Sequence, residues 1–142
     1  MHFSARPAAQ ISGGKVKRMA KAMVIDDSRA IRMILGRTLS QHGYEVSTAG
    51  NGREALELLK AAPSNPNLVL VDWNMPEMNG LEFVKAFRAD PKFSDVPLMM
   101  VTTETEIDQM VRALEAGANE YVMKPFTEDI IADKLRVLGL IQ

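Results

Sequence analysis

The sequence contains no cysteine among its 142 residues. Disulfide bonds and thiolate metal sites are therefore excluded, and the absence fits a cytoplasmic protein. No apolar run approaches the roughly 18 residues that cross a membrane, so we expect no membrane span. The formal net charge of −1 provides no overall field for nucleic acid, and no DNA-binding domain is expected. What is present, 46% hydrophobic and 25% charged residues, is ordinary for one globular domain.

Charge is unevenly distributed along the chain. Residues 1–20 contain no acid and carry +4, which leaves −5 for the remainder; the four bases are Arg6, Lys15, Lys17 and Arg18. This segment has no apolar period and contains Pro7 and Gly13-Gly14, so we predict a disordered basic leader over residues 1–20. Met19 stands just before the first predicted strand, which makes an artefactual leader the alternative. The folded domain is predicted over residues 21–142.

Short apolar segments alternate with amphipathic segments throughout residues 21–142. Five strands are predicted, at 21–25, 44–49, 68–71, 96–101 and 120–123, and a helical pattern follows each of them. Such alternation predicts an α/β fold with a parallel sheet and helices on both faces. The segment 44–49 alternates apolar and polar residues and is predicted at an edge, whereas 21–25, which is apolar after Lys21, and 68–71 are predicted to be central. The pattern alone does not give the strand order.

The helix after the fourth strand has its own start signal. Thr103 and Glu106 have the spacing of a capping box, which predicts a helix beginning just after Thr103. Four apolar residues then fall on one helical face: Ile107, Met110, Val111 and Leu114.

Polar groups stand at the ends of four predicted strands: Asp26-Asp27, Asp72, Thr102 and Lys124. The carboxyl ends of parallel strands lie at one edge of a sheet, so these groups can meet. Crowded carboxylates repel one another unless a cation compensates, and hard oxygen ligands suit Mg²⁺. A lysine and a hydroxyl would stabilise transferred phosphoryl oxygens, and one aspartate could form an acyl phosphate. The cluster therefore predicts a magnesium-dependent phosphoryl site, against the alternative that Asp72 merely ends a strand.

From about residue 22 onwards the chain resembles a bacterial response-regulator receiver domain, in the single-domain form used in chemotaxis. The matching motifs, each short but together specific in this order, are Ile25-Asp26-Asp27-Ser28, Val71-Asp72-Trp73-Asn74-Met75-Pro76, Asn79-Gly80, Met100-Val101-Thr102 and Tyr121-Val122-Met123-Lys124-Pro125-Phe126. The resemblance implies a flavodoxin-like sheet of five parallel strands in the order 2-1-3-4-5, flanked by five helices.

The resemblance also implies a role for each residue of the cluster. Asp72 would accept a phosphoryl group from a histidine kinase. Asp27 and Asp72 would bind Mg²⁺ together with the backbone carbonyl of Asn74, and Asp26 would act through a metal-bound water. Lys124 would pair with a phosphoryl oxygen, and its peptide bond to Pro125 would be cis.

The resemblance also implies residues that respond to the phosphoryl group and residues that set its lifetime. Thr102 would follow the phosphoryl group and Tyr121 would turn inward, which would change the face made by the fourth helix, the last strand and the last helix. Asn74 and Glu104 would tune the lifetime of the phosphoryl group. The expected partners are the kinase and a downstream effector such as a flagellar switch component. We expect a monomeric regulator that is not an enzyme acting on outside substrates.

Several other functions remain open at this stage. A stand-alone receiver could serve a phosphorelay outside chemotaxis or act as a phosphate sink. A magnesium-dependent phosphatase with an aspartate nucleophile would need an acid two residues after Asp72, where Asn74 cannot transfer a proton. Binding of a flavin phosphate is disfavoured by repulsion from Asp26-Asp27. A calcium-binding EF-hand is disfavoured because Pro76 and Glu77 occupy its next ligand and glycine positions.

Overall fold

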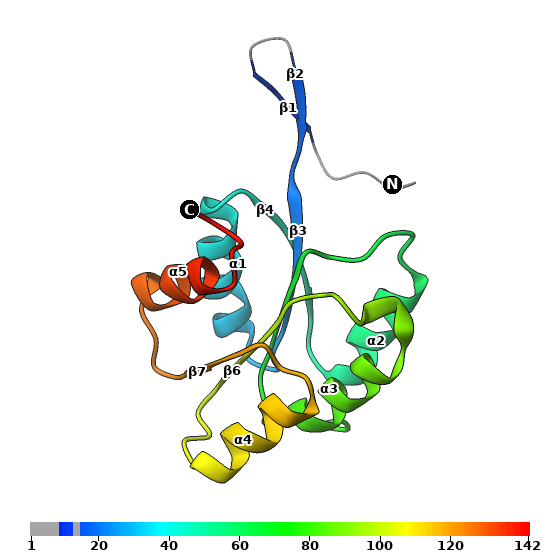
Figure 1. The fold of residues 1–142 in the computed structure, drawn as a ribbon, viewed down its shortest axis with the longest axis vertical. Helices are drawn as coiled ribbons and strands as arrows, with labels where there is room; N and C mark the ends of the chain where they lie inside the picture. The colour runs from blue at the N-terminus through cyan, green and yellow to red at the C-terminus, as the bar shows by residue number, and fades with distance from the viewer. Residues whose placement is uncertain (1–8, 13–14) are drawn as a thin grey trace.

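The computed structural model describes residues 9–12 and 15–142, with side chains from Met19 onwards. Its core is a parallel five-stranded sheet (Figure 1). In spatial order the strands are β4 (Tyr44–Ala49), β3 (Ala20–Ile25), β5 (Leu68–Val71), β6 (Leu98–Thr102) and β7 (Glu120–Met123). When only the five strands of this sheet are numbered along the chain, their spatial order is 2-1-3-4-5. The predicted fold, with 44–49 at an edge, is therefore confirmed.

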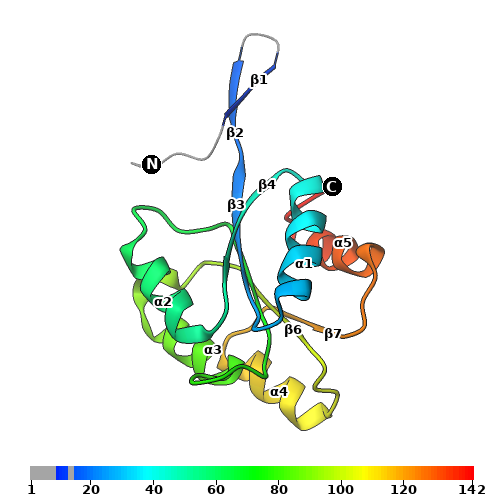
Figure 2. The same cartoon turned by 180° about the vertical axis from the view of Figure 1, so that it is seen from behind.

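In the described part of the chain, five α-helices cover the two faces of the sheet (Figures 1 and 2). One face carries α1 (Arg29–Gln41) and α5 (Glu128–Val137). The other carries α2 (Gly52–Ala61), α3 (Gly80–Ala89) and α4 (Ile107–Ala116), with a short 3₁₀ turn η1 (Pro91–Phe93) after α3.

The central strand β5 shows why the sheet is covered on both sides. Leu68 and Leu70 pack into the core beneath α1 and α5, whereas Val69 and Val71 pack into the core beneath α2, α3 and α4. All four side chains are almost completely buried. A continuous apolar run is what a strand needs when both of its faces are dry.

Side chains cap four of the helices. Ser28 begins α1, Asn51 begins α2 and Thr127 begins α5, each accepting a hydrogen bond from a backbone N–H of the first turn. Asn79 forms a full capping box with Glu82 at the start of α3. Each cap satisfies a backbone N–H group of the first turn, so the helix begins at a defined residue after its strand.

The start of α4 differs from the prediction. The capping box of Thr103 and Glu106 is not formed: α4 begins at Ile107, and Glu106 makes no capping bond with its side chain. The amide of Glu104 instead bonds to Thr102 Oγ1 at 3.3 Å, and Glu104 also contacts Asn74 and Tyr121, so these contacts of the loop override the local cap signal. The connection between β6 and α4 is consequently longer than the sequence suggested.

The apolar face of α4 also lies largely outside the core. Ile107 is 73% exposed, and Val111 and Leu114 are more than 40% exposed. Met110 packs against the core, and Ala113 is the fully buried residue of this helix. Helix α4 therefore presents apolar surface to solvent.

The predicted disordered leader spans residues 1–20, of which 1–8 and 13–14 lie outside the described residues. In the described part, β1 (Ala9–Ser12) and β2 (Lys15–Arg18) pair as an antiparallel ribbon, and β3 follows from Ala20. The domain boundary at residue 21 stays a prediction. Among the helices in residues 9–12 and 15–142, none is long and apolar enough to cross a membrane.

Candidate functional site

Three carboxylates converge at the carboxyl edge of the sheet. Strands β3 and β5 are paired in parallel with Ile25 opposite Val71, so the residues that follow leave the sheet side by side. One carboxylate oxygen from each of Asp26, Asp27 and Asp72 lies within 4.8 Å of the other two. Asp26 and Asp72 are buried, whereas Asp27 is exposed. The structure thus brings together the three acids singled out in the sequence.

Lys124 reaches this acid cluster from the end of β7. Its Nζ lies 2.8 Å from Asp26 Oδ2 and 3.2 Å from Asp72 Oδ2, and its side chain is 12% exposed. The peptide bond between Lys124 and Pro125 is cis. One cation and three carboxylates therefore share a small volume, which is nearly dry around Lys124, Asp26 and Asp72 and open to water at Asp27.

The charges in this volume are not fully balanced. Burial raises the pKa of Asp26 above its ordinary value, and hydrogen bonds from Lys124 and the Ser28 amide offset this only in part. Burial alone would lower the pKa of Lys124, but its hydrogen bond to Asp26 and the charge of Asp72 outweigh burial and raise that pKa. Burial therefore makes the ionised form of Asp26 less favourable than in water, and additional positive charge would stabilise that form.

This donor set fits Mg²⁺. The ion takes oxygen ligands, commonly one or two carboxylates, and retains several waters. Within the described residues, the Asp27 side chain makes no hydrogen bond or ion pair, so its oxygens are available. An exposed carboxylate beside two buried ones leaves one side of the site open to water and to a phosphoryl group.

The main chain around Asp26 is held by a residue that the sequence analysis missed. Arg32 Nη1 donates a 2.7 Å hydrogen bond to the backbone oxygen of Asp26, and the Ser28 amide donates one of 2.9 Å to Asp26 Oδ1. An arginine on an amphipathic helix gives no local signal of such a contact, because only the path of the loop brings the two groups together.

Thr102 and Tyr121 lie on the two strands beyond the acids. Thr102 is fully buried at the end of β6. Tyr121 is also buried, and its hydroxyl donates a 2.8 Å hydrogen bond to the backbone oxygen of Glu104. Burial, together with the charges of Glu104 and Asp72, raises the pKa of Tyr121. The tyrosine is therefore turned inward and tied to the loop between β6 and α4.

Glu104 connects this tyrosine with the acid cluster. Its Oε2 accepts a 2.8 Å hydrogen bond from the side-chain amide of Asn74, which stands two residues after Asp72. The backbone amide of Asn74 in turn contacts Asp72 Oδ1 at 3.4 Å. A short chain of contacts thus runs from Asp72 through Asn74 and Glu104 to Tyr121.

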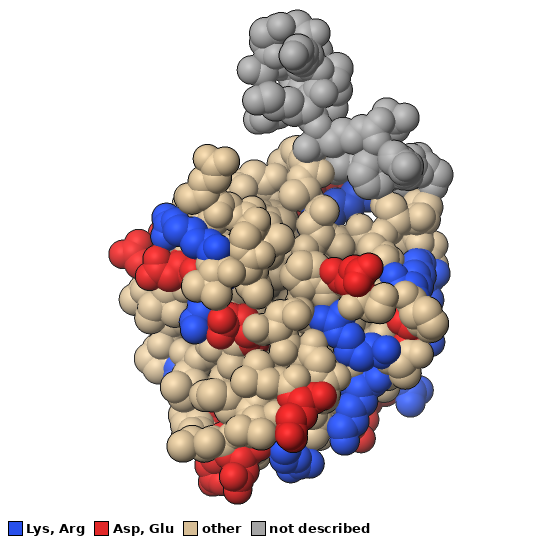
Figure 3. Space-filling model, in the orientation of Figure 1, with Lys and Arg blue, Asp and Glu red and all other residues tan. Residues whose placement is uncertain are grey.

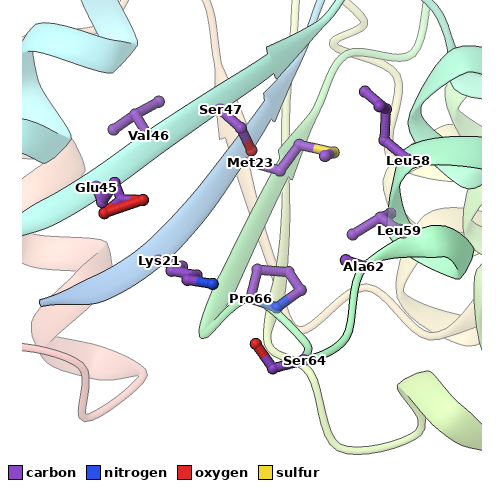
Figure 4. Close-up of a pocket in the computed structure, with 10 residues that line it drawn as sticks. All are labelled: Lys21, Met23, Glu45, Val46, Ser47, Leu58, Leu59, Ala62, Ser64 and Pro66. Atoms are coloured by element: carbon purple, nitrogen blue, oxygen red, sulfur yellow. The ribbon is translucent and has the colours of Figure 1, made fainter. Parts of the chain in front are cut away.

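The pocket in Figure 4 lies elsewhere. It has a volume of about 270 Å³ and is lined by residues near the amino ends of β3 and β4, including Lys21 and Glu45, and by the end of α2 and the loop after it. None of the predicted site residues lines it. The acids stand at the opposite ends of these strands, so the cavity and the acid cluster are separate features.

The face shown in Figure 3 carries no patch of a single charge sign, because its Lys and Arg side chains are interspersed with Asp and Glu side chains.

Comparison with known proteins agrees with this geometry. The protein-family model described as response regulator receiver domain matches residues 22–136 of this chain. The chain is 46% identical over 119 residues to the chemotaxis protein CheY1 of Helicobacter pylori strain J99, covering 83% of this chain and 95% of that protein. It is also 46% identical over 121 residues to the chemotaxis protein CheY homolog of Campylobacter jejuni strain 81-176, covering 84% of this chain and 92% of the homolog.

A solved structure agrees as well. The crystallised chemotaxis protein CheY4 of Vibrio cholerae superposes with a TM-score of 0.78 at 39% identity, covering 84% of this chain and 98% of that chain. With the family model matched over residues 22–136 and the same sheet in a solved relative, the chain belongs to the response-regulator receiver domains of the CheY type.

Proposed function

We propose that this protein is a phosphorylation switch in which Asp72 accepts a phosphoryl group from the phosphohistidine of a kinase. The convergence of Asp26, Asp27, Asp72 and Lys124 on one small volume carries the proposal. An oxygen of the Asp72 carboxylate forms the new bond to phosphorus as the bond from phosphorus to the histidine nitrogen breaks. The histidine keeps the electron pair and takes a proton from solvent, so a regulator is modified and no outside substrate is turned over.

Two positive groups would stabilise the negative charge of the phosphoryl oxygens during transfer to Asp72. Asp27, Asp72 and the backbone carbonyl of Asn74 would hold Mg²⁺, with Asp26 acting through a bound water. When bound, the ion supplies positive charge to the phosphoryl oxygens. The Lys124 ammonium, already 3.2 Å from Asp72 Oδ2, provides a second positive group for those oxygens.

The fully buried Thr102 passes the change on. Its hydroxyl now accepts a bond from the Glu104 amide at 3.3 Å. When the hydroxyl turns to donate to a phosphoryl oxygen, the loop that carries Glu104 must adjust. Both the contact with Asn74 and the hydrogen bond from Tyr121 depend on Glu104. We also assign Asn74 and Glu104 to control of the phosphoryl lifetime, a role that the family resemblance implies and that their 2.8 Å hydrogen bond close to Asp72 supports.

The output surface is the face made by α4, β7 and α5. It exposes apolar side chains from all three elements, namely Ile107, Val111, Leu114, Met123 and Ile130. Movement of the loop before α4 would reshape this surface and change its affinity for a partner. Since the relatives are named as chemotaxis proteins, we propose that the partner is a component of the flagellar switch.

Phosphorylation is tested with acetyl phosphate and Mg²⁺, followed by intact-mass spectrometry. The wild-type chain should gain one phosphoryl group, and Asp72→Ala should gain none. Asp133→Ala, which removes an exposed acid of α5, is the matched control and should behave as the wild type. Equal labelling of Asp72→Ala and the control would disprove the assignment.

Output is tested with beryllofluoride, a mimic of the phosphoryl group. In its presence with Mg²⁺, amide hydrogen exchange should change in residues 103–110 and in β7, and binding to the flagellar switch protein of the same organism should strengthen. An unchanged exchange pattern on this face, with beryllofluoride bound, would argue against the switch.

A further inference from the structure

The least supported group of the acid cluster is the Asp27 side chain. Asp26 and Asp72 are buried and paired with Lys124, but Asp27 is exposed and makes no side-chain hydrogen bond or ion pair within the described residues. Because no side-chain partner orients the Asp27 carboxylate, its direction depends on the conformation of the Asp27 backbone. Its metal affinity then depends on how firmly the main chain on each side is held.

On one side of Asp27 the main chain is held by the start of α1. The amide of Ser28 donates a 2.9 Å hydrogen bond to Asp26 Oδ1, and Ser28 Oγ accepts a 3.3 Å bond from the Ile31 amide. Because this residue is the cap of a helix of 13 residues, its backbone is fixed with respect to the whole of α1.

On the other side the constraint comes from Arg32. Its guanidinium folds back from the second turn of α1 to the backbone oxygen of Asp26, and the separation of 2.7 Å is typical of a hydrogen bond from a charged donor. That oxygen belongs to the peptide unit joining Asp26 to Asp27. Since a peptide unit is planar, a hydrogen bond to its oxygen restrains the plane and hence the direction in which the Asp27 backbone departs.

The Arg32 side chain lies between α1 and the turn that follows β4. It is partly buried and lines a small hollow with Arg29, Met33 and Thr48. A Cβ built on Gly50 would stand 3.7 Å from Nη1, so the turn after β4 passes close to the guanidinium.

We infer that Arg32 is a positioning residue, which orients the peptide unit between Asp26 and Asp27 and so preorganises the Asp27 carboxylate for a divalent cation. The inference rests on the proposed function, because it concerns the same metal site. Residues that orient metal ligands through a hydrogen bond typically change metal affinity by 10- to 100-fold when they are replaced. Arg32 itself touches neither the cation nor the phosphoryl group.

The test compares two arginines of the same helix. Arg32→Met removes the bond to the loop, whereas Arg29→Met removes an equal charge from the exposed first turn of α1. Mg²⁺ affinity is measured by isothermal titration calorimetry, and thermal unfolding is measured without metal. We expect Arg32→Met to bind Mg²⁺ at least about tenfold more weakly than Arg29→Met. Arg32→Lys, which keeps the charge and one donor, should recover part of the affinity.

A second measurement separates positioning from mere stability. Phosphorylation by acetyl phosphate should require more Mg²⁺ in Arg32→Met but reach nearly the wild-type rate at saturating Mg²⁺. If Arg32→Met does not fold, Arg32→Gln takes its place in both measurements.

The inference is overturned if the folded Arg32 variant and Arg29→Met bind Mg²⁺ within twofold of each other, whatever their thermal stabilities. Failure of the proposed function is a different result, in which the wild-type chain itself neither binds Mg²⁺ nor becomes phosphorylated.

Discussion

Lys124 Nζ lies 2.8 Å from Asp26 Oδ2, although the two residues are 98 positions apart in the chain. The pair joins the end of the last strand of the sheet to the end of the first, across the strands that carry Asp72 and Thr102. A buried cation between carboxylates both stabilises the fold and prepares the site for an incoming anion.

Replacing Lys124 by Met should destabilise the protein. It leaves Asp26 and Asp72 buried without their cation, and breaking a buried pair by removing one partner costs about 3 kcal/mol or more. Because folding raises the pKa of Lys124, the stability it contributes is present below its unfolded pKa and is lost only at strongly alkaline pH. Urea unfolding near neutral pH measures the loss. Lys85→Met, an exposed lysine on α3, is the control, and equal stability of the two variants would contradict the prediction.

Replacing Asp26 by Asn should have the opposite effect on stability. Burial raises the pKa of Asp26 in the folded state, so the protonated form is favoured by folding. Its favourable contribution is present below the unfolded pKa of about 3.9 and is lost as the pH rises through the folded value. Without Mg²⁺, Asp26→Asn should therefore unfold at a higher temperature than the wild type near neutral pH. The difference should shrink in acid, and a difference independent of pH would refute this cause.

Mg²⁺ should stabilise the wild-type protein and not Asp27→Ala. An ion that binds only the folded chain adds about 2.7 kcal/mol at a concentration 100 times its dissociation constant. A Mg²⁺ titration followed by thermal unfolding measures this shift, and a chelator should reverse it. Asp108→Ala, which removes an exposed acid of α4, should keep the full response. A normal response in Asp27→Ala would show that this residue is not a ligand.

Replacing Tyr121 by Phe should uncouple the output face while leaving phosphorylation intact. The substitution removes the hydroxyl that donates to the Glu104 backbone, a bond worth about 1 kcal/mol. We expect acetyl phosphate to label Asp72 at the wild-type rate, whereas the exchange change induced by beryllofluoride in residues 103–110 should be smaller. Tyr44→Phe alters the other tyrosine, which lies in the core under α1 and α5, and should show the full change.

Replacing Gly80 by Ala should damage the site through the backbone. A Cβ at Gly80 would collide with the backbone oxygen of Asp72 and come within 2.8 Å of Trp73 Cα, so the main chain after β5 would have to shift. Overpacking of this kind costs about 1–3 kcal/mol. We expect lower thermal stability and weaker Mg²⁺ binding together. Gly36→Ala in α1, where the nearest side-chain atom is 3.7 Å from the new Cβ, should fold at least as stably as the wild type.

Much of the architecture was predictable because it is written in local patterns. The unbroken apolar run of β5 and the alternation in β4 each depend on residues within a few positions of one another. The placement of acids, hydroxyl and lysine directly after strands is likewise a local feature. Once the sheet is parallel, that placement brings the groups to one edge.

Other features depended on how distant segments meet. The capping signal of Thr103 and Glu106 was wrong because Glu104 and its loop are engaged by Asn74 and Tyr121, which lie far away in sequence. The apolar stripe of α4 suggested no particular exposure, since periodicity shows a face but not whether anything covers it.

The sequence alone established which groups stand at the strand ends, since strand periodicity and turn chemistry act over a few residues. Their separations, the bond from Arg32 to the Asp26 backbone and the exposure of α4 were settled by tertiary packing. Each of these depends on sheet register and on the path of a loop past its neighbours, and no short stretch of sequence encodes such distances.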